Sequence, residues 1–283
     1  MTLPPVAYLR PATVEAAVAA LAADEDARLL AGGQTLMATI ATGLFRPSAM
    51  VSLAGIAELR GIARLPDGTV RIGAMATHAE VAASPHFAGG QRLLPLVAGR
   101  IAYPAVRNFG TVGGAAAHGD PASDWPSLLV AADARLHLAG PGGRRSVAAE
   151  AFFLDFLTTA LDAGEMVVAV DVPPRPGRAA AERIVRAAGD YATLSVLATA
   201  QTAEGVCRAV RIAVGSCGVR PLRSPEAEAM LVGRRVDADL ARAAGRALAA
   251  AAEPHDDVRA SAAYRRRVIP ALVALALTEA LAP

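Results

Sequence analysis

The sequence predicts an α+β protein made of an α/β amino-terminal region, residues 1–175, and a smaller carboxy-terminal α+β domain, residues 178–283. Strand-like and helix-like segments alternate through the first third of the chain, as in βαβ units. The run Pro173–Gly177 (Pro-Pro-Arg-Pro-Gly) is the strongest linker candidate. Beyond it, two segments joined by a short turn predict an antiparallel strand pair, and three helical segments follow.

Residues 1–56 are expected to form one subdomain and residues 57–175 a second. In the first, apolar residues recur at helical spacing and strands flank the paired glycines Gly32 and Gly33. Its predicted elements are a helix over Thr13–Ala23, a strand over Ala27–Ala31, a helix over Leu36–Gly43 and a strand over Ala49–Leu53.

The second subdomain begins with a strand that leads into a capped helix. Thr77 is the predicted N-cap, and Glu80 three residues later completes a capping box. Its predicted elements are strands over Arg71–Thr77 and Glu165–Val172 and helices from Thr77 to Ala83, over Leu93–Ala102 and over Ser123–Ala134.

The carboxy-terminal domain opens with two predicted strands, Tyr191–Thr202 and Val206–Gly215, joined by an Ala-Glu-Gly turn. The run Arg265–Arg267 is expected on a solvated helix face or at a partner contact. The predicted helices are Ser224–Val232, Asp237–Ala252 and Ser261–Leu281, the last bent at Pro270.

Composition excludes several classes of protein. The net charge is +2, all 28 basic residues are arginine and no dense basic block occurs, so we expect no nucleic-acid binding. The longest apolar run, Val268–Leu277, is too short to cross a bilayer. Met1–Arg10 lacks the features of a secretory signal, so we expect a cytoplasmic protein. The two cysteines, Cys207 and Cys217, are too few to ligate an iron–sulfur cluster.

The first informative motif is Leu29–Leu36, in which a strand runs into Gly32 and Gly33 and then into a helix. Glycines let backbone N–H groups approach an anion, and the helix dipole favours negative charge. Gln34 and Thr35 offer further donors. The motif lacks the spacing of a Rossmann turn, and an ordinary strand–turn–helix junction is an alternative explanation.

The second motif is Ile101–Asp124. Gly110, Gly113 and Gly114 interrupt an apparent strand, which indicates close approach by another group. Thr111 can donate to phosphate; Asp124 can bind a ribose or adenine group or act as a helix cap. Two separate glycine loops suit a dinucleotide in a cleft.

These motifs resemble a known family. Ala31–Leu36 (AGGQTL) is similar to the AGGQSL loop of the FAD-binding subunits of molybdenum hydroxylases, the xanthine dehydrogenase and aerobic carbon monoxide dehydrogenase family. Ile101–Asp124 is similar to the second signature of that family, IAxPx[VI]RNxGT[IV]GG followed by HxDPA and an acid. Three shorter matches follow the family order: Ile72–Thr77 (IGAMAT), Arg186–Ala192 (RAAGDYA) and Ser261–Arg265 (SAAYR).

The resemblance implies a two-subdomain FAD-binding fold of the vanillyl-alcohol-oxidase type, followed by a carboxy-terminal domain of the carbon monoxide dehydrogenase flavoprotein type. It places Asp124 at the adenosine end of FAD and Leu161 against the adenine. Arg183 stands where the family has a lysine near the flavin ring, and this departure leaves the detailed contact open. The other implied contacts are Ala31, Gly32, Gly33, Gln34, Thr35 and Leu36 in the first loop, and Ile101, Ala102, Gly110, Thr111, Gly114 and Ala115 in the second.

The resemblance also implies an electron-transfer role. We expect a small [2Fe–2S] subunit and a large molybdopterin subunit as partners, in a dimer of heterotrimers, and quinone, NAD+ or oxygen as the external acceptor. No catalytic residue and no metal site are expected in this chain. Two alternatives remain open: a self-contained FAD-dependent oxidoreductase with its own substrate pocket, and a non-enzymatic nucleotide-binding module.

Overall fold

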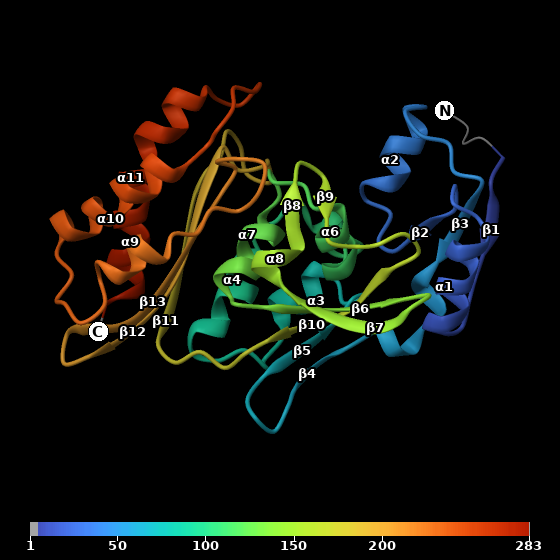
Figure 1. The fold of residues 1–283 in the computed structure, drawn as a ribbon, viewed down its shortest axis with the longest axis horizontal. Coiled ribbons are helices and arrows are strands. Elements are labelled where there is room, and N and C mark those ends of the chain that lie inside the picture. The colour runs from blue at the N-terminus through green and yellow to red at the C-terminus, as the bar shows by residue number, and fades with distance from the viewer. Residues whose placement is uncertain (1–4, 283) are drawn as a thin grey trace.

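The computed structural model describes residues 5–282 and has the predicted mixed α+β architecture. Met1–Pro4, part of the segment on which no secretory signal is predicted, and Pro283 lie outside the described residues. Three modules follow one another along the long axis of the molecule (Figure 1). The amino-terminal sheet lies at one end, a five-stranded sheet with its helices lies in the middle, and the carboxy-terminal sheet and helices lie at the other end.

The amino-terminal module is a three-stranded parallel sheet in the order β1–β3–β2. Helix α1 begins where Thr13 accepts a hydrogen bond from the Ala16 backbone N–H, and its buried side includes Val14 and Val18. The elements are β1 (Ala7–Leu9), α1 (Val14–Ala23), β2 (Arg28–Leu30), α2 (Leu36–Ala41), β3 (Ala49–Ser52) and the short 3₁₀ helices η1 (Leu53–Gly55) and η2 (Ala57–Leu59). The predicted helices and strands of this module are confirmed.

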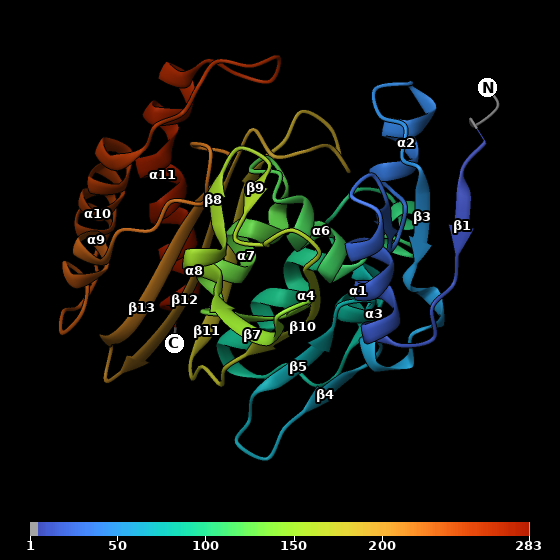
Figure 2. The same cartoon turned by 45° about the vertical axis from the view of Figure 1, so that its right-hand side comes forward.

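The middle module is an antiparallel five-stranded sheet in the order β4–β5–β10–β6–β7. Helices cover one of its faces (Figure 2). Its strands are β4 (Ile62–Arg64), β5 (Val70–Gly73), β6 (Arg135–Gly140), β7 (Gly143–Ala148) and β10 (Met166–Val172), and a small hairpin comprises β8 (Phe153–Asp155) and β9 (Thr158–Thr159). The helices are α3 (His78–Ala83), η3 (Gly89–Arg92), α4 (Leu93–Ala98), α5 (Pro104–Arg107), α6 (Val112–His118), α7 (Asp124–Ala131) and α8 (Ala149–Phe152).

The carboxy-terminal module is a three-stranded antiparallel sheet with helices packed on its outer face. Side chains of β12 alternate between two cores: Val196 and Ala198 pack with the outer helices, while Leu197 belongs to the core of the middle module. Figure 2 shows α10 and α11 on one side of this sheet and α4 and α7 on the other. The elements are β11 (Arg178–Ile184), β12 (Leu194–Ala203), β13 (Val206–Gly215), α9 (Pro225–Ala229), α10 (Ala238–Ala251) and α11 (Ala262–Ala280).

A buried arginine joins the middle and carboxy-terminal modules. Arg211 on β13 donates from Nε to the Val130 carbonyl oxygen at 2.8 Å, which lies in the last turn of α7. Its Nη2 lies 3.1 Å from a carboxylate oxygen of Glu150.

The segment Pro173–Gly177 carries no helix or strand, yet the Arg175 carbonyl oxygen accepts a hydrogen bond from Gly90 N at 2.8 Å. The connection between β10 and β11 is therefore fixed to the middle module.

Several sequence predictions are corrected. The segment after Thr111 is not an interrupted strand but helix α6. The strand expected over residues 71–77 ends at Gly73, where the chain passes so close to Leu59 that a Cβ would lie 2.3 Å from its carbonyl oxygen. Arg265 is not solvated: it is 2% exposed and its Nε donates to the Thr193 carbonyl oxygen. Strands β6, β7 and β11 were not predicted: β7 is rich in arginine and β11 in alanine, so neither has a clear alternating apolar pattern, whereas β6 does alternate, with Leu136 and Leu138 buried.

Candidate cofactor site

The two glycine loops touch each other directly. Gly32 follows β2, and a Cβ on it would lie 2.0 Å from the Phe109 carbonyl oxygen in the second loop. Gly33 has φ +69°, a backbone conformation that residues other than glycine rarely adopt. The first glycine therefore admits the other loop, and the second glycine allows the chain to turn into α2.

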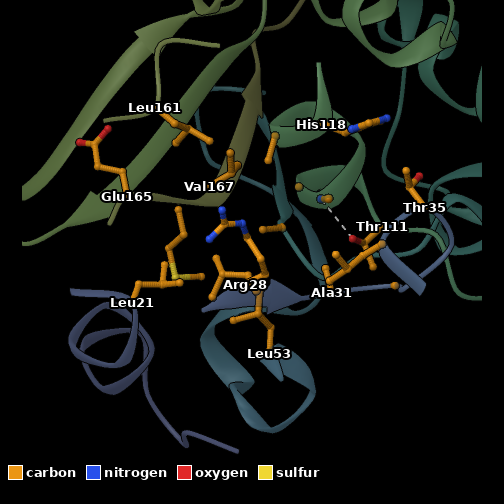
Figure 3. A pocket seen from close by; sticks show the side chains of 18 of the residues that line it. Leu21, Arg28, Ala31, Thr35, Leu53, Thr111, His118, Leu161, Glu165 and Val167 are labelled. Atoms are coloured by element: carbon orange, nitrogen blue, oxygen red, sulfur yellow. Dashed lines mark hydrogen bonds between the residues drawn. The ribbon is translucent and has the colours of Figure 1, made fainter. Parts of the chain in front are cut away.

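The second loop is the capped amino terminus of α6. The Thr111 hydroxyl accepts a hydrogen bond from Gly114 N at 3.2 Å, shown as the dashed line in Figure 3. Gly113 lets α6 pack on the chain after β5, because a Cβ there would lie 2.5 Å from the Ala74 Cβ. A Cβ on Gly114 would lie 2.9 Å from the Thr111 hydroxyl and 3.3 Å from the Ala31 Cβ of the first loop.

A cavity of about 900 Å³ opens between the two loops. Ligand sites in proteins usually enclose about 300 to 1,000 Å³, so this cavity suits a large ligand. Figure 3 shows Ala31 and Thr35 on one wall, Thr111 beside them, and Leu161 and Glu165 across the cavity. Eleven of the residues predicted to bind the cofactor line it: Ala31, Gly32, Gly33, Gln34, Thr35, Leu36, Gly110, Thr111, Gly114, Ala115 and Leu161.

Sequence reasoning missed much of the lining. One end of the cavity is formed by apolar side chains from α1, β2, η1 and β10, which were not predicted to bind the cofactor and which meet only in the fold. Charged groups also line it, and Arg28 is held by hydrogen bonds to the carbonyl oxygens of Glu25 and Ala27. The lining residues outside the predicted cofactor-binding set include Leu21, Leu29, Leu53, Met166 and Val167, the charged Asp24, Glu25, Arg28 and Glu165, and the histidines His78 and His118.

The polar groups of the two loops beside the cavity include donors suited to an anion. Thr35 stands at the N-cap of α2, but its side chain makes no capping hydrogen bond, unlike that of Thr111. The Gln34 side chain donates to the Gly32 carbonyl oxygen at 3.1 Å, which braces the first loop. The amino termini of α2 and α6 both border the cavity, and the backbone N–H groups there favour negative charge.

The remaining four predicted residues do not line this cavity but gather in a second group. Arg183 on β11 lies with its Nε 3.2 Å from a carboxylate oxygen of Asp124, and both side chains are buried. Arg183 also donates to the carbonyl oxygen of Arg100, next to Ile101, at 3.1 Å. Ala102 has φ 42°. The guanidinium of Arg107 donates hydrogen bonds of 2.8 Å to the carbonyl oxygens of both Ile101 and Ala102.

This second group contains polar atoms that the chain leaves without a hydrogen-bond partner. Asp124 Oδ1 and Arg183 Nε are buried and form no properly oriented hydrogen bond, although they approach each other as an ion pair. Burial raises the pKa of the Asp124 carboxyl, and the charge of Arg183 opposes that rise. Buried orphaned polar atoms are rare in proteins, so a ligand group that bonds to them fits here.

The structure thus defines a dinucleotide-binding protein: two glycine loops in direct contact border a large cavity, and Asp124 and Arg183 form a buried polar pair outside its lining. Within residues 5–282, no group of three or more His, Cys, Asp and Glu side chains could hold a metal ion. Over the same residues, no helix has the length and apolar character needed to cross a membrane.

Comparison with known proteins agrees with this class. Residues 4–175 match the family model described as the FAD binding domain in molybdopterin dehydrogenase, and residues 179–280 match the carbon monoxide dehydrogenase flavoprotein carboxy-terminal domain. The nicotine 6-hydroxylase medium subunit of Paenarthrobacter nicotinovorans is 35% identical over 99% of both chains. The carbon monoxide dehydrogenase medium chain of Hydrogenophaga pseudoflava is 36% identical, over 99% of this chain and 98% of the relative. A solved structure of quinoline 2-oxidoreductase from Pseudomonas putida 86 superposes with a TM-score of 0.94 at 33% identity, over 99% of this chain and 98% of that chain.

The chain belongs to the family of FAD-binding subunits of molybdenum hydroxylases. Its cofactor is FAD, and it is a flavoprotein subunit of an oxidoreductase. The family resemblance predicted from the five motifs is confirmed.

Proposed function

We propose that this chain relays electrons from [2Fe–2S] clusters in a small partner subunit, through its FAD, to an external acceptor such as quinone, NAD+ or oxygen. The observation that carries the proposal is the match of nearly the whole chain to flavoprotein subunits, combined with a cavity shaped by two glycine loops. The chain's own thiols, Cys207 and Cys217, are free and buried in the carboxy-terminal core, so clusters are expected on another chain. FAD, when bound, supplies the redox chemistry, and the protein supplies its position and surroundings.

The pyrophosphate of FAD is proposed to lie between the two loops. Gly32–Leu36 would hold it from the α2 side, and Thr111 and Gly114 from the α6 side, with Gly110 and Ala115 close by. Leu161 would pack against the adenine, together with apolar side chains that sequence reasoning missed. In this arrangement the charge of the pyrophosphate meets backbone N–H groups and two helix amino termini.

The contacts expected of Asp124 and Arg183 need revision. The resemblance placed Asp124 at the adenosine end and Arg183 near the flavin ring, yet the two side chains are 3.2 Å apart. An extended FAD cannot bring both of its ends to one ion pair. We assign both residues to the ring end, because Asp124 does not line the cavity that contains Leu161 and because Arg183 contacts the backbone beside Ile101. There the pair would orient the ring, and Ile101 and Ala102 would pack beside it.

We further propose that the protein works in the cytoplasm in a complex with the small [2Fe–2S] subunit and a large molybdopterin subunit, as a dimer of heterotrimers. The names of its relatives as medium subunits and medium chains support a place in a multi-subunit complex. Free thiols are usual in a reducing compartment. The domain division at residues 175–178 is part of the same proposal, since two separate family models meet there.

Reconstitution tests the relay. The purified chain is loaded with FAD and mixed anaerobically with the small and large subunits and the substrate of the large subunit. We expect the flavin absorbance to bleach with all three chains and to remain when the iron–sulfur chain is omitted. Substrate-dependent bleaching in this chain alone would show instead a self-contained oxidoreductase.

A further inference from the structure

His78 is a buried residue in the cavity wall that no sequence motif assigned to the cofactor. It is the first residue of α3, is 5% exposed and lines the cavity between the two loops. Its backbone N donates to the Gly110 carbonyl oxygen at 3.0 Å, which fixes α3 relative to the second loop.

Trp125 determines which imidazole nitrogen of His78 carries the proton. The indole Nε1 lies 3.1 Å from His78 Nδ1, and the two ring centroids are 5.5 Å apart. An indole nitrogen can only donate, so Nδ1 must accept and the proton of the neutral ring lies on Nε2. Burial, with the positive charge of Arg107 adding to its effect, lowers the pKa of His78 to about 4, so the ring is neutral near pH 7.

The free Nε2–H of His78 lies beside the second glycine loop. A Cβ on Gly110 would lie 2.7 Å from Nε2, so glycine at this position makes room for the imidazole. Within residues 5–282, Nε2 has no hydrogen-bond acceptor. It is also not fully buried, since the fully buried polar atoms without a partner belong to other residues. Since His78 and Gly110 both line the cavity, the donor is open to it.

We infer that His78 is a cofactor-binding residue whose Nε2–H donates a hydrogen bond to the pyrophosphate of the dinucleotide held between the two glycine loops. The inference rests on the proposed position of the pyrophosphate. It gives Trp125 a positioning role, because the indole fixes the ring of His78 and leaves its outer nitrogen as a donor. The sequence alone indicates only that some group approaches Gly110 closely. In the structure that group is the imidazole of His78.

Two substitutions separate hydrogen bonding from packing. His78→Gln keeps an acceptor for Trp125 and a donor for the cavity, whereas His78→Leu keeps similar bulk and has neither. FAD and ADP are titrated separately into the full-length apoprotein, with flavin fluorescence for FAD and calorimetry for ADP. We expect His78→Leu to weaken both ligands by about tenfold and His78→Gln by less than about threefold. Unchanged FAD affinity in His78→Leu, or a loss for FAD with none for ADP, would overturn the inference.

Nuclear magnetic resonance of the wild-type chain tests the same contact without a variant that has to fold. The chain has five histidines, so ¹⁵N-histidine labelling gives few signals, and His78→Gln identifies the one that belongs to His78. We expect a proton on Nε2 in the apoprotein and a shift of that signal on adding ADP or FAD. A signal that FAD leaves unmoved would refute the role of His78, whereas failure of the wild-type chain to bind FAD at all would refute the proposed function itself.

Discussion

Both loops are rich in glycine and contain a threonine, but they use their glycines differently. In the first loop, Gly32 makes room for the backbone of the second loop and Gly33 supplies a left-handed turn. In the second loop, Gly110 makes room for His78 and Gly113 for Ala74, while Gly114 lies against Thr111 and Ala31. Most of these glycines are therefore required by contacts within the protein. A glycine-rich motif predicts close approach, but it does not say what approaches.

The loops also differ in how their threonines are used. Thr111 caps α6 through its hydroxyl, whereas the Thr35 side chain does not cap α2. The hydroxyl of Thr111 thus serves the fold, and that of Thr35 remains available for a ligand. This comparison predicts that substituting Thr35 lowers FAD affinity with little change in stability, whereas substituting Thr111 lowers stability.

Gly32→Ala should have the largest effect. The new Cβ would lie 2.0 Å from a backbone oxygen that no side-chain rotation can move, so the two loops must separate. We expect the free energy of unfolding in urea to fall by about 3 kcal/mol or more and FAD binding to be lost. Gly142→Ala, in the β6–β7 turn with no atom within 4 Å of its Cβ, is the control and should change stability by less than about 0.5 kcal/mol. Equal stability of the two variants would contradict the direct contact between the loops.

Gly113→Ala should have an intermediate effect. Overpacking against Ala74 costs about 1 to 3 kcal/mol, while replacing glycine within a helix gains at most about 1 kcal/mol. The clash should exceed the gain, so we expect a net loss of about 1 to 2 kcal/mol in urea unfolding. A more stable variant would mean that α6 moves away from β5 at little cost.

Thr111→Val should destabilise the protein by about 1 kcal/mol, the usual cost of losing an N-cap acceptor. Valine keeps the shape of threonine, so the loss reports the hydrogen bond to Gly114 N. FAD affinity should fall as well, because the hydroxyl hydrogen of Thr111 is not used by the cap and is proposed to be donated to the pyrophosphate. Thr111→Ser restores the hydroxyl and should return stability to within about 0.5 kcal/mol of wild type. A Thr111→Ser variant as unstable as Thr111→Val would show that the methyl group, and not the cap, is required.

Thr35→Val should have the smallest effect on stability, less than about 0.5 kcal/mol, because its side chain does not cap α2. Its effect should appear in the dissociation constant for FAD, which we expect to rise about tenfold. Urea unfolding of the apoprotein and flavin titration measure the two quantities. If Thr35→Val lost stability and kept its affinity, the contrast between the two threonines would be reversed.

Much of the fold follows from local patterns. Thr13, Ser224, Asp237 and Ser261 each begin a helix where capping chemistry predicts one, and Thr77 with Glu80 forms the predicted capping box. The strand Val206–Gly215 has the predicted bounds, and the turn before it adopts positive φ at Glu204 and Gly205. These features depend on residues within one or two turns of each other, so the sequence alone contains them.

Other features depended on contacts between distant segments. Helix α6 could not be distinguished from an interrupted strand, because its glycines are determined by Ala74 and Ala31 and not by their neighbours in sequence. The burial of Arg265 requires carbonyl groups of Thr193 and His255, which reach it only in the folded domain. No local rule could have predicted these environments.

The sequence by itself determined the family, the cofactor and the two glycine loops that border the first cavity, because these loops carry particular residues at fixed spacing along the chain. Only the tertiary structure decided which glycines contact protein rather than ligand, that Asp124 and Arg183 form one buried pair, and that Trp125 fixes the imidazole of His78. The reason is physical: spacing along the chain controls local backbone geometry, whereas ion pairing, burial and tautomer depend on side chains that lie far apart in sequence.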